Sequence, residues 1–242
     1  MRSIVAVLLP TLAACPIEPD PDFVDPRDGL LFEWEFAGNP ASVPDGSDHG
    51  YTLALEGTAA ADGAAAFDGQ AALGRGPDLA EVIPTLGALT LEARVRITDP
   101  TDDFTARPIV WVPQTAATGN FGVGLVVNTA ARRLQFELVA GDAHVFVYRD
   151  QLYDDAWVTV HGTYDGMAAQ LWVDGEAPVD AASASGTLDA FDFEFGAQVI
   201  TVGGRESATE RLGCEIRELR GFDRALSAEE VADRHARLSA DD

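Results

Sequence analysis

The sequence predicts an all-β sandwich, and three patterns in the chain support this fold class. First, residues 157–175 alternate apolar and polar side chains around two Asp-Gly dipeptides, at residues 165–166 and 174–175. Asp-Gly in such a setting is a strong hairpin signal, because both central positions of the tight turn need positive φ. Second, short strand-like runs separated by turn residues continue along the chain from Gly29. Third, the chain shows neither a Gly-rich phosphate loop nor the βαβ alternation of parallel sheets.

The individual strands are identified by side-chain alternation along an extended backbone. In residues 31–36 the aromatic side chains share one face, and Glu33 and Glu35 share the other. In residues 90–97 apolar side chains again occupy every second position. Further strands are expected at residues 123–127, 134–139, 144–149, 157–164, 168–173, 199–203 and 215–222. The total is about ten to thirteen strands, as in sandwiches and barrels.

One helix is expected near the end of the chain. Ser227-Ala-Glu-Glu230 matches the capping box, with Ser227 as the N-cap and Glu230 at the third helical position. Val231 and either His235 or Ala236 are expected to face the sheet.

Composition limits the class of partner. The 242 residues suit one sandwich domain, and 47% hydrophobic content is enough for a sizeable core. The formal net charge of −24 disfavours nucleic acid and anionic lipid headgroups as partners. The same charge is compatible with cationic partners, with divalent ions, or simply with solubility.

The N-terminal residues indicate a targeting signal. Arg2 precedes the apolar residues 4–12, a run too short to span a bilayer as a helix, so residues 1–14 are interpreted as a signal peptide. The following Cys15 completes Leu-Ala-Ala-Cys, which resembles the bacterial lipobox and implies a lipid on Cys15. Ordinary cleavage near Ala14 is the alternative.

Two further parts of the chain are expected after the signal peptide. Residues 15–28 are rich in proline and aspartate and are expected to form an extended tether, and residues 29–242 form the folded domain. The lipid would hold this domain at the bacterial cell envelope, on the outer membrane or the cell surface.

Five segments, taken in order, resemble the laminin G-like, concanavalin A-like jelly-roll family. They are VPDGSDHG (residues 43–50), AFDG (66–69), LTLEARVR (89–96), the double hairpin (157–175) and the stretch IRELRGFDRALSAEEV (216–231). The resemblance implies two curved antiparallel sheets packed face to face. It also implies a binding or adhesion module, often for carbohydrate and often with structural calcium. Arg217 stands where the family often has a calcium-binding aspartate, and Cys214 stands where glycine is common.

Calcium is the one metal that the sequence suggests. Asp45 and Asp48 lie in the Gly-containing loop that matches the family's acidic opening loop. Carboxylate oxygens are preferred calcium ligands. The alternative is a turn that uses Asp and Gly for their backbone preferences.

A carbohydrate site would need exposed aromatic rings with polar neighbours. Trp111, Phe121, Tyr148 and Tyr153 lie near expected loops and are the candidate ligand-binding residues. Trp157 and Trp172 lie in framework strands and are expected in the core.

No catalytic residues are assigned. Two carboxylate pairs have the i, i+2 spacing that places both on one strand face, Glu33 with Glu35 and Asp192 with Glu194. The Glu-x-Asp-x-Glu strand of hydrolases with this fold is absent, however, and both pairs alternate with aromatic residues. The histidines lack metal-ligand spacing and are expected to be exposed or hydrogen-bonded: His49, His144, His161 and His235.

The sequence therefore predicts a lipid-anchored surface protein whose sandwich domain binds a glycan or a protein. Two alternatives are a polysaccharide-active enzyme of the same fold and an envelope structural protein without a small ligand.

Overall fold

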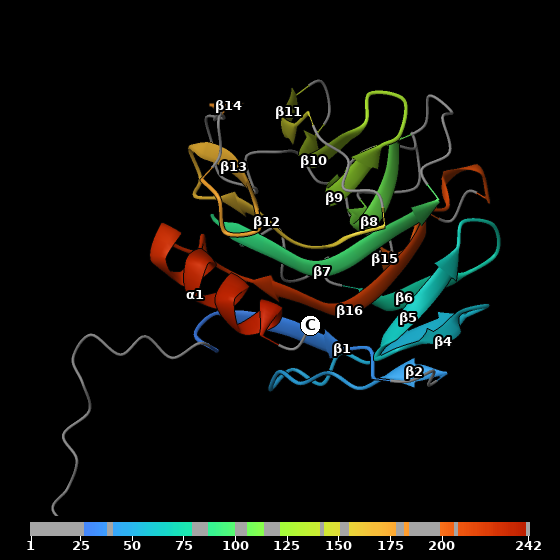
Figure 1. The fold of residues 1–242 in the computed structure, drawn as a ribbon. Coiled ribbons are helices and arrows are strands. Elements are labelled where there is room, and N and C mark those ends of the chain that lie inside the picture. The colour runs from blue at the N-terminus through green and yellow to red at the C-terminus, as the bar shows by residue number, and fades with distance from the viewer. Residues whose placement is uncertain are drawn as a thin grey trace, which may run out of the picture.

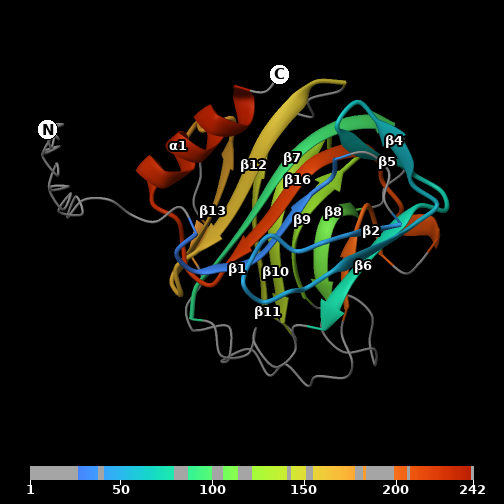
Figure 2. The ribbon, with the colours of Figure 1, turned by 90° about the horizontal axis from the view of Figure 1, so that it is seen from below.

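Two antiparallel eight-stranded sheets pack face to face in the computed structural model (Figures 1 and 2). The structure describes residues 27–37, 41–78, 87–99, 106–113, 122–140, 143–150, 155–177, 182–183, 199–205 and 208–240. Over these residues it contains sixteen strands and one α-helix. Within the same part of the chain, no helix is long and apolar enough to cross a membrane.

The first sheet has the order β14-β13-β12-β7-β16-β5-β4, and β1 also pairs with β16. Its strands are β1 (Leu30–Glu35), β4 (Ala59–Ala61), β5 (Ala64–Asp68), β7 (Leu89–Asp99), β12 (Trp157–Tyr164), β13 (Ala168–Val173), β14 (Ala182–Ser183) and β16 (Gly213–Phe222).

The second sheet has the order β11-β10-β9-β8-β15-β6-β3-β2. Its strands are β2 (Ser42–Val43), β3 (Leu53–Glu56), β6 (Leu73–Asp78), β8 (Ala106–Pro113), β9 (Gly122–Asn128), β10 (Arg133–Ala140), β11 (Ala143–Arg149) and β15 (Val199–Val202). A single 3-10 turn at Ala208–Glu210 completes the described secondary structure.

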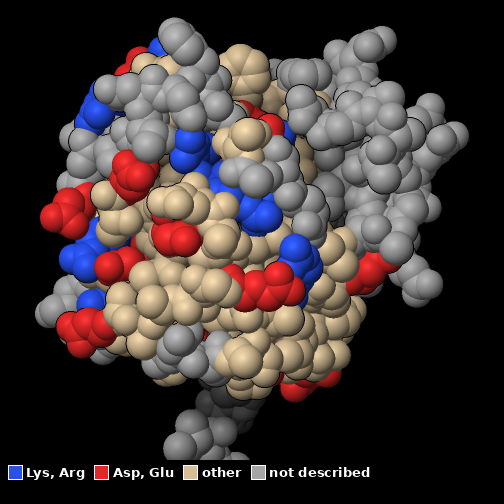
Figure 3. Space-filling model, turned by 90° about the vertical axis from the view of Figure 1, so that its right-hand side faces the viewer, with Lys and Arg blue, Asp and Glu red and all other residues tan. Residues whose placement is uncertain are grey.

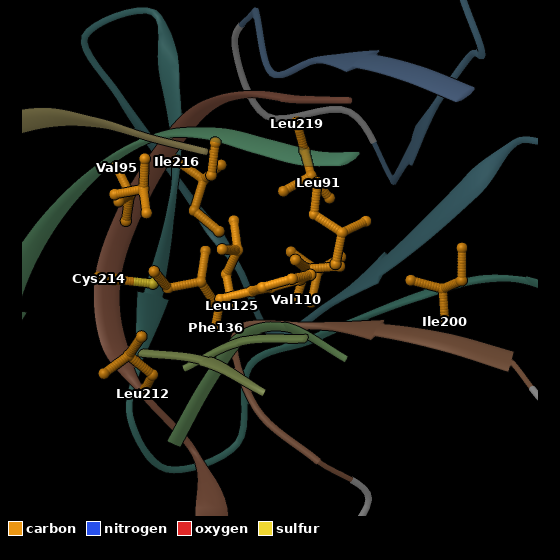
Figure 4. Packing of buried hydrophobic residues seen from close by; sticks show 14 of the residues in the cluster. Leu91, Val95, Val110, Leu125, Phe136, Ile200, Leu212, Cys214, Ile216 and Leu219 are labelled. Carbon is orange, nitrogen blue, oxygen red and sulfur yellow. The ribbon is translucent and has the colours of Figure 1, made fainter. Parts of the chain in front are cut away.

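The core lies between the two sheets and is built from the alternating residues of both. Leu91 and Val95 from β7 meet Val110, Leu125 and Phe136 from the second sheet, and all are at most 1% exposed (Figure 4). Burying one such side chain stabilises the fold by roughly 1.5–3 kcal/mol.

Close packing at the centre of β12 requires a residue without a side chain. A Cβ added to Gly162 would lie 2.2 Å from Cδ2 of Phe136, well inside van der Waals contact. Gly162 therefore allows the ring of Phe136, on β10, to reach the first sheet.

The two predicted Asp-Gly turns differ in the structure. At 174–175 both residues have positive φ, 51° for Asp174 and 72° for Gly175, which confirms the expectation. At 165–166 only Gly166 has positive φ, so the prediction of two positive angles there is wrong. The Asp165 carboxylate instead accepts hydrogen bonds from the backbone N–H groups of Met167 and Ala168, and this local bonding shapes a longer turn.

The helix α1 (Ala228–Ser239) begins as predicted, with Ser227 and Glu230 forming a complete capping box. It lies on the outer face of the first sheet (Figures 1 and 2). Its buried residues are Val231, Arg234 and Leu238. The expectation for its sheet-facing side needs correction, since Ala236 is exposed and His235 is only half-buried.

Candidate functional site

An aromatic pair is exposed on the second sheet. Phe146 and Tyr148 occupy alternate positions of β11 and are 50% and 38% exposed, whereas Val147 between them is 3% exposed and lies in the core. Their ring centroids are 6.3 Å apart and the ring planes differ by 28°. Because β11 is at the edge of its sheet, the pair lies on the outer surface, at a margin of the sandwich.

Polar groups surround this pair. The guanidinium of Arg133 lies 4.0 Å from the centroid of the Tyr148 ring, and Arg133 also pairs with Asp150. Gln135 is directly opposite Tyr148 across the β10–β11 ladder. The side-chain oxygen of Gln135 is buried and has no hydrogen-bond partner in the part of the chain that the structure describes. We call Phe146, Tyr148, Arg133 and Gln135 the aromatic face.

Sequence reasoning found Tyr148 but missed Phe146. The signal was present, because residues two apart on a strand share a face. Of the other predicted aromatic ligands, Phe121 and Tyr153 lie outside the described residues.

Trp111 is not the exposed platform that its position near a loop suggested. It is 2% exposed and packs on Val126 and Val139, and the guanidinium of Arg205 lies 4.1 Å from its ring centroid. Added Cβ atoms at Gly122 and Gly124 would both come within 3 Å of the ring, so these glycines let the indole lie flat on β9.

The framework tryptophans differ from each other. Trp172 is 7% exposed and packs with Leu226 and Val231 beneath α1, which confirms its place in a core. Trp157 is only half-buried, so the prediction that it lies in the core is not met in full. Two guanidiniums lie close to its ring centroid, that of Arg96 at 5.3 Å and that of Arg217 at 4.3 Å.

Asp45 organises the loop that the sequence linked to calcium. Its carboxylate accepts hydrogen bonds from the backbone N–H groups of Glu33, Ser47 and Tyr51 at 2.8–2.9 Å. The Ser47 hydroxyl adds a fourth bond of 2.6 Å. Burial raises the pKa of Asp45, but these bonds outweigh burial and lower the pKa overall. Asp48 is exposed.

Within the described ranges, no group of three or more His, Cys, Asp or Glu residues is arranged to hold a metal ion. The two-residue calcium assignment to Asp45 and Asp48 remains a prediction.

The carboxylate pairs considered for catalysis have different surroundings. Glu33 pairs with Arg220 at 2.6 Å and with Arg27 at 3.2 Å. Although burial opposes it, these guanidiniums hold the pKa of Glu33 below its usual value, which does not suit a general acid. The side chain of Glu35 is 64% exposed. Asp192 and Glu194 lie outside the described residues.

A buried charged cluster lies under α1, and sequence reasoning missed it. Glu92, on the outer face of β7, is 1% exposed. Its carboxylate contacts Nε2 of His161 at 2.9 Å, a guanidinium nitrogen of Arg220 at 2.9 Å and one of Arg234 at 3.0 Å. Burial alone would raise the pKa of Glu92, but the bonds to His161 and Arg234 bring the pKa well below its usual value. We call Glu92, His161, Arg220 and Arg234 the Glu92 cluster.

The remaining histidines are scattered. His49 is exposed and stacks on Tyr51 with ring centroids 5.3 Å apart. His235 approaches Asp174 at 4.0 Å. The side chain of His144 lies outside the description.

Among the charged groups on the face seen in Figure 3, acidic and basic side chains are interspersed.

Comparisons with known proteins agree with this architecture. The sequence profile of the Concanavalin A-like lectin/glucanases superfamily matches residues 49–232. The receptor-binding domain of botulinum neurotoxin D superposes with a TM-score of 0.67 at 13% identity, covering 88% of this chain and 54% of that chain. Trypanosoma rangeli sialidase superposes with a TM-score of 0.65 at 15% identity, covering 88% of this chain and 33% of that one.

These structural similarities, at such low identity, establish the fold alone. The chain spans about half the length of the toxin domain and a third of the sialidase. A search of curated proteins found no match.

Proposed function

Because the chain belongs to the Concanavalin A-like lectin/glucanases superfamily, we propose that it is a carbohydrate-binding domain held at the bacterial cell envelope by a lipid on Cys15. The observation that carries the binding proposal is the aromatic face. Exposed rings beside polar groups suit a sugar, whose apolar C–H face can lie on a ring while its hydroxyls bond to the polar neighbours.

The aromatic face offers both kinds of contact. Phe146 contributes the most exposed ring of this face. The guanidinium of Arg133 lies over one face of the Tyr148 ring and pairs with Asp150, so donors and acceptors are close to the rings. The rings are large, apolar and already stacked on each other, so little conformational entropy is lost when a ligand binds.

Two structural relatives support a binding role by analogy. One is the receptor-binding domain of a toxin, and one sialidase structure contains sialic acid. The anchor is supported by the Leu-Ala-Ala-Cys motif after an apolar run, and by the Pro- and Asp-rich residues 16–28, which suit an extended tether.

A glycan array tests the proposal, using residues 28–242 with and without calcium. We expect at least one glycan class to bind the wild-type domain and to be lost from the Phe146→Ala/Tyr148→Ala double variant. Met167→Ala is the matched control, because Met167 is 74% exposed on the β12–β13 turn, which belongs to the other sheet. No glycan binding by the wild type, or binding that survives the double variant, would refute the carbohydrate site. Absence of glycan binding by the wild type would favour a protein ligand or a structural role, whereas binding that survives the double variant would place the glycan at another site.

A further inference from the structure

A cleft of about 370 Å³ opens between α1 and the strands β1 and β16, on the outer side of the first sheet. Three glutamates, four arginines and two leucines line it: Glu33, Glu35, Glu218, Arg27, Arg220, Arg234, Arg237, Leu30 and Leu238. This volume is within the range of small-molecule sites. The cleft is on the opposite sheet from the aromatic face, so a ligand bound in it would be independent of a glycan bound at that face.

The floor of the cleft is rigid and charged. Arg220 and Arg234 are each 9% exposed and are fixed by Glu92, which lies directly beneath them. Leu30 and Leu238, each 8% exposed, supply the apolar part of the wall. Because buried ion pairs and packed leucines restrict these side chains, the cleft is formed before any ligand arrives.

On the strand side of the cleft, two glutamates share one arginine. Glu35 and Glu218 are directly opposite each other in the β1–β16 ladder, a placement in which like charges repel. Both depend on Arg220, at 3.5 Å from Glu35 and 2.5 Å from Glu218. Arg220 also serves Glu33 and Glu92. Since Glu33 is also paired with Arg27, and Glu92 with Arg234, only Glu35 and Glu218 have Arg220 as their one ion-pair partner among the described residues.

Burial and the neighbouring carboxylates of Glu35 and Glu92 raise the pKa of Glu218, despite the opposing effect of Arg220.

The helix side of the cleft carries a cation. Arg237 is exposed in the last turn of α1 and lines the cleft. Its side chain makes no ion pair or hydrogen bond with any other residue in the described ranges. Glu35 and Glu218 on the strands and Arg237 on the helix thus line the same cleft, together with Leu30 and Leu238.

We propose that this cleft binds a small zwitterion of amino-acid size, with its ammonium against Glu35 and Glu218, its carboxylate against Arg237, and its apolar part against Leu30 and Leu238. A ligand of this kind supplies positive charge to the strands and negative charge to the helix. Charge-assisted hydrogen bonds of both signs would form at once.

Calorimetric titration of the full chain, solubilised in mild detergent, tests the proposal with three probes of the same carbon skeleton. These are leucine, isoamylamine, which lacks the carboxylate, and 4-methylpentanoate, which lacks the ammonium. We expect leucine to bind roughly tenfold more tightly than either half-molecule, since each loses one charge-assisted contact. Absence of binding by leucine, or equal binding of all three probes, would overturn the proposal.

Two variants test separately the contributions of the positive and the negative side chains of the cleft to ligand affinity. Arg237→Gln should weaken leucine roughly tenfold while leaving isoamylamine unchanged, and Glu35→Gln should weaken leucine and isoamylamine alike. Both side chains are exposed, so thermal midpoints are expected to stay near the wild-type value. Glu229→Gln, on an exposed position of α1 outside the cleft, is the control. Wild-type leucine affinity in Arg237→Gln and Glu35→Gln would assign the binding to another site.

Discussion

The carboxylate of Glu92 on β7 accepts hydrogen bonds from the guanidinium of Arg234 on α1, and both side chains are buried. The sequence separation of 142 residues makes this contact a link between the sheet and the C-terminal helix. The link gives α1 a specific docking position in addition to the apolar contacts of Val231 and Leu226.

Replacing Glu92 should strongly destabilise the fold. Glu92→Gln removes the charge that compensates Arg220 and Arg234, and breaking a buried ion pair costs about 3–5 kcal/mol. Urea unfolding monitored by circular dichroism measures the change in the free energy of unfolding. Glu229→Gln is the matched control, and an equal unfolding midpoint in both variants would contradict a structural role for the cluster.

Acid should weaken the start of α1. Glu230 accepts hydrogen bonds from Arg224 and from the Ser227 backbone, and chiefly the Arg224 bond lowers the pKa of Glu230 from 4.5 to about 2. A lowered pKa means that the stabilisation is complete above the unfolded value and is lost as pH falls from about 4.5 towards 2.

Urea midpoints measured from pH 6 to pH 2 test this prediction. We expect the decline between pH 5 and pH 2 to be shallower in Glu230→Gln than in the wild type, because the variant has no carboxylate to protonate there. Parallel curves would show that Glu230 does not contribute to the acid sensitivity.

Gly162→Ala should destabilise the core. The new methyl group would overlap the ring of Phe136, and overpacking of this kind typically costs about 1–3 kcal/mol. The second-site change Phe136→Leu provides the test of mechanism. The double variant is expected to be less destabilised than the sum of the two single changes, and additive free energies would exclude a direct clash.

Substitutions of Asp45 and of Asp48 are expected to have different effects on thermal stability. Asp45→Ala leaves three backbone N–H groups without their acceptor and should lower stability by roughly 2 kcal/mol even in the presence of a chelator. If calcium binds at this loop as predicted, the chelator lowers the thermal midpoint of the wild type but not that of Asp48→Ala. A wild-type midpoint that is unchanged by the chelator would refute the calcium site.

Lipid attachment is tested by metabolic labelling in a bacterial host with an alkyne analogue of palmitate. We expect label in the wild type and none in Cys15→Ser, with the variant released from the membrane fraction. Cys214→Ser is the control and should label like the wild type. Label retained in Cys15→Ser would refute the lipobox assignment.

Local signals were enough to predict most of the fold. Alternation located β7, β12 and β13 to within two residues, and the capping box located the start of α1. The strands β2 to β6, β8 and β14 were missed. Among them, stretches such as Ala59–Ala61 and Leu73–Asp78 have no alternating large side chains. Their pairing depends on distant partners, which a local pattern does not contain.

The site was less predictable than the fold for a related reason. Alternation shows that Glu92 and Arg94 share the face opposite the core, but it does not show that this face is covered by α1. In the same way, proximity to a loop made Trp111 a candidate although Arg205 covers its ring. Tyr148 was chosen for the same reason, its position near an expected loop, and in the structure it is 38% exposed on the edge strand β11.

The buried thiol of Cys214 can be used to measure local unfolding of the domain. Apart from Cys15, it is the only cysteine in the sequence. Burial raises its pKa, so the folded protein presents almost no thiolate to a thiol reagent. The alkylation rate of Cys214 under native conditions therefore measures how often β16 becomes exposed to solvent. This strand lies at the centre of the first sheet.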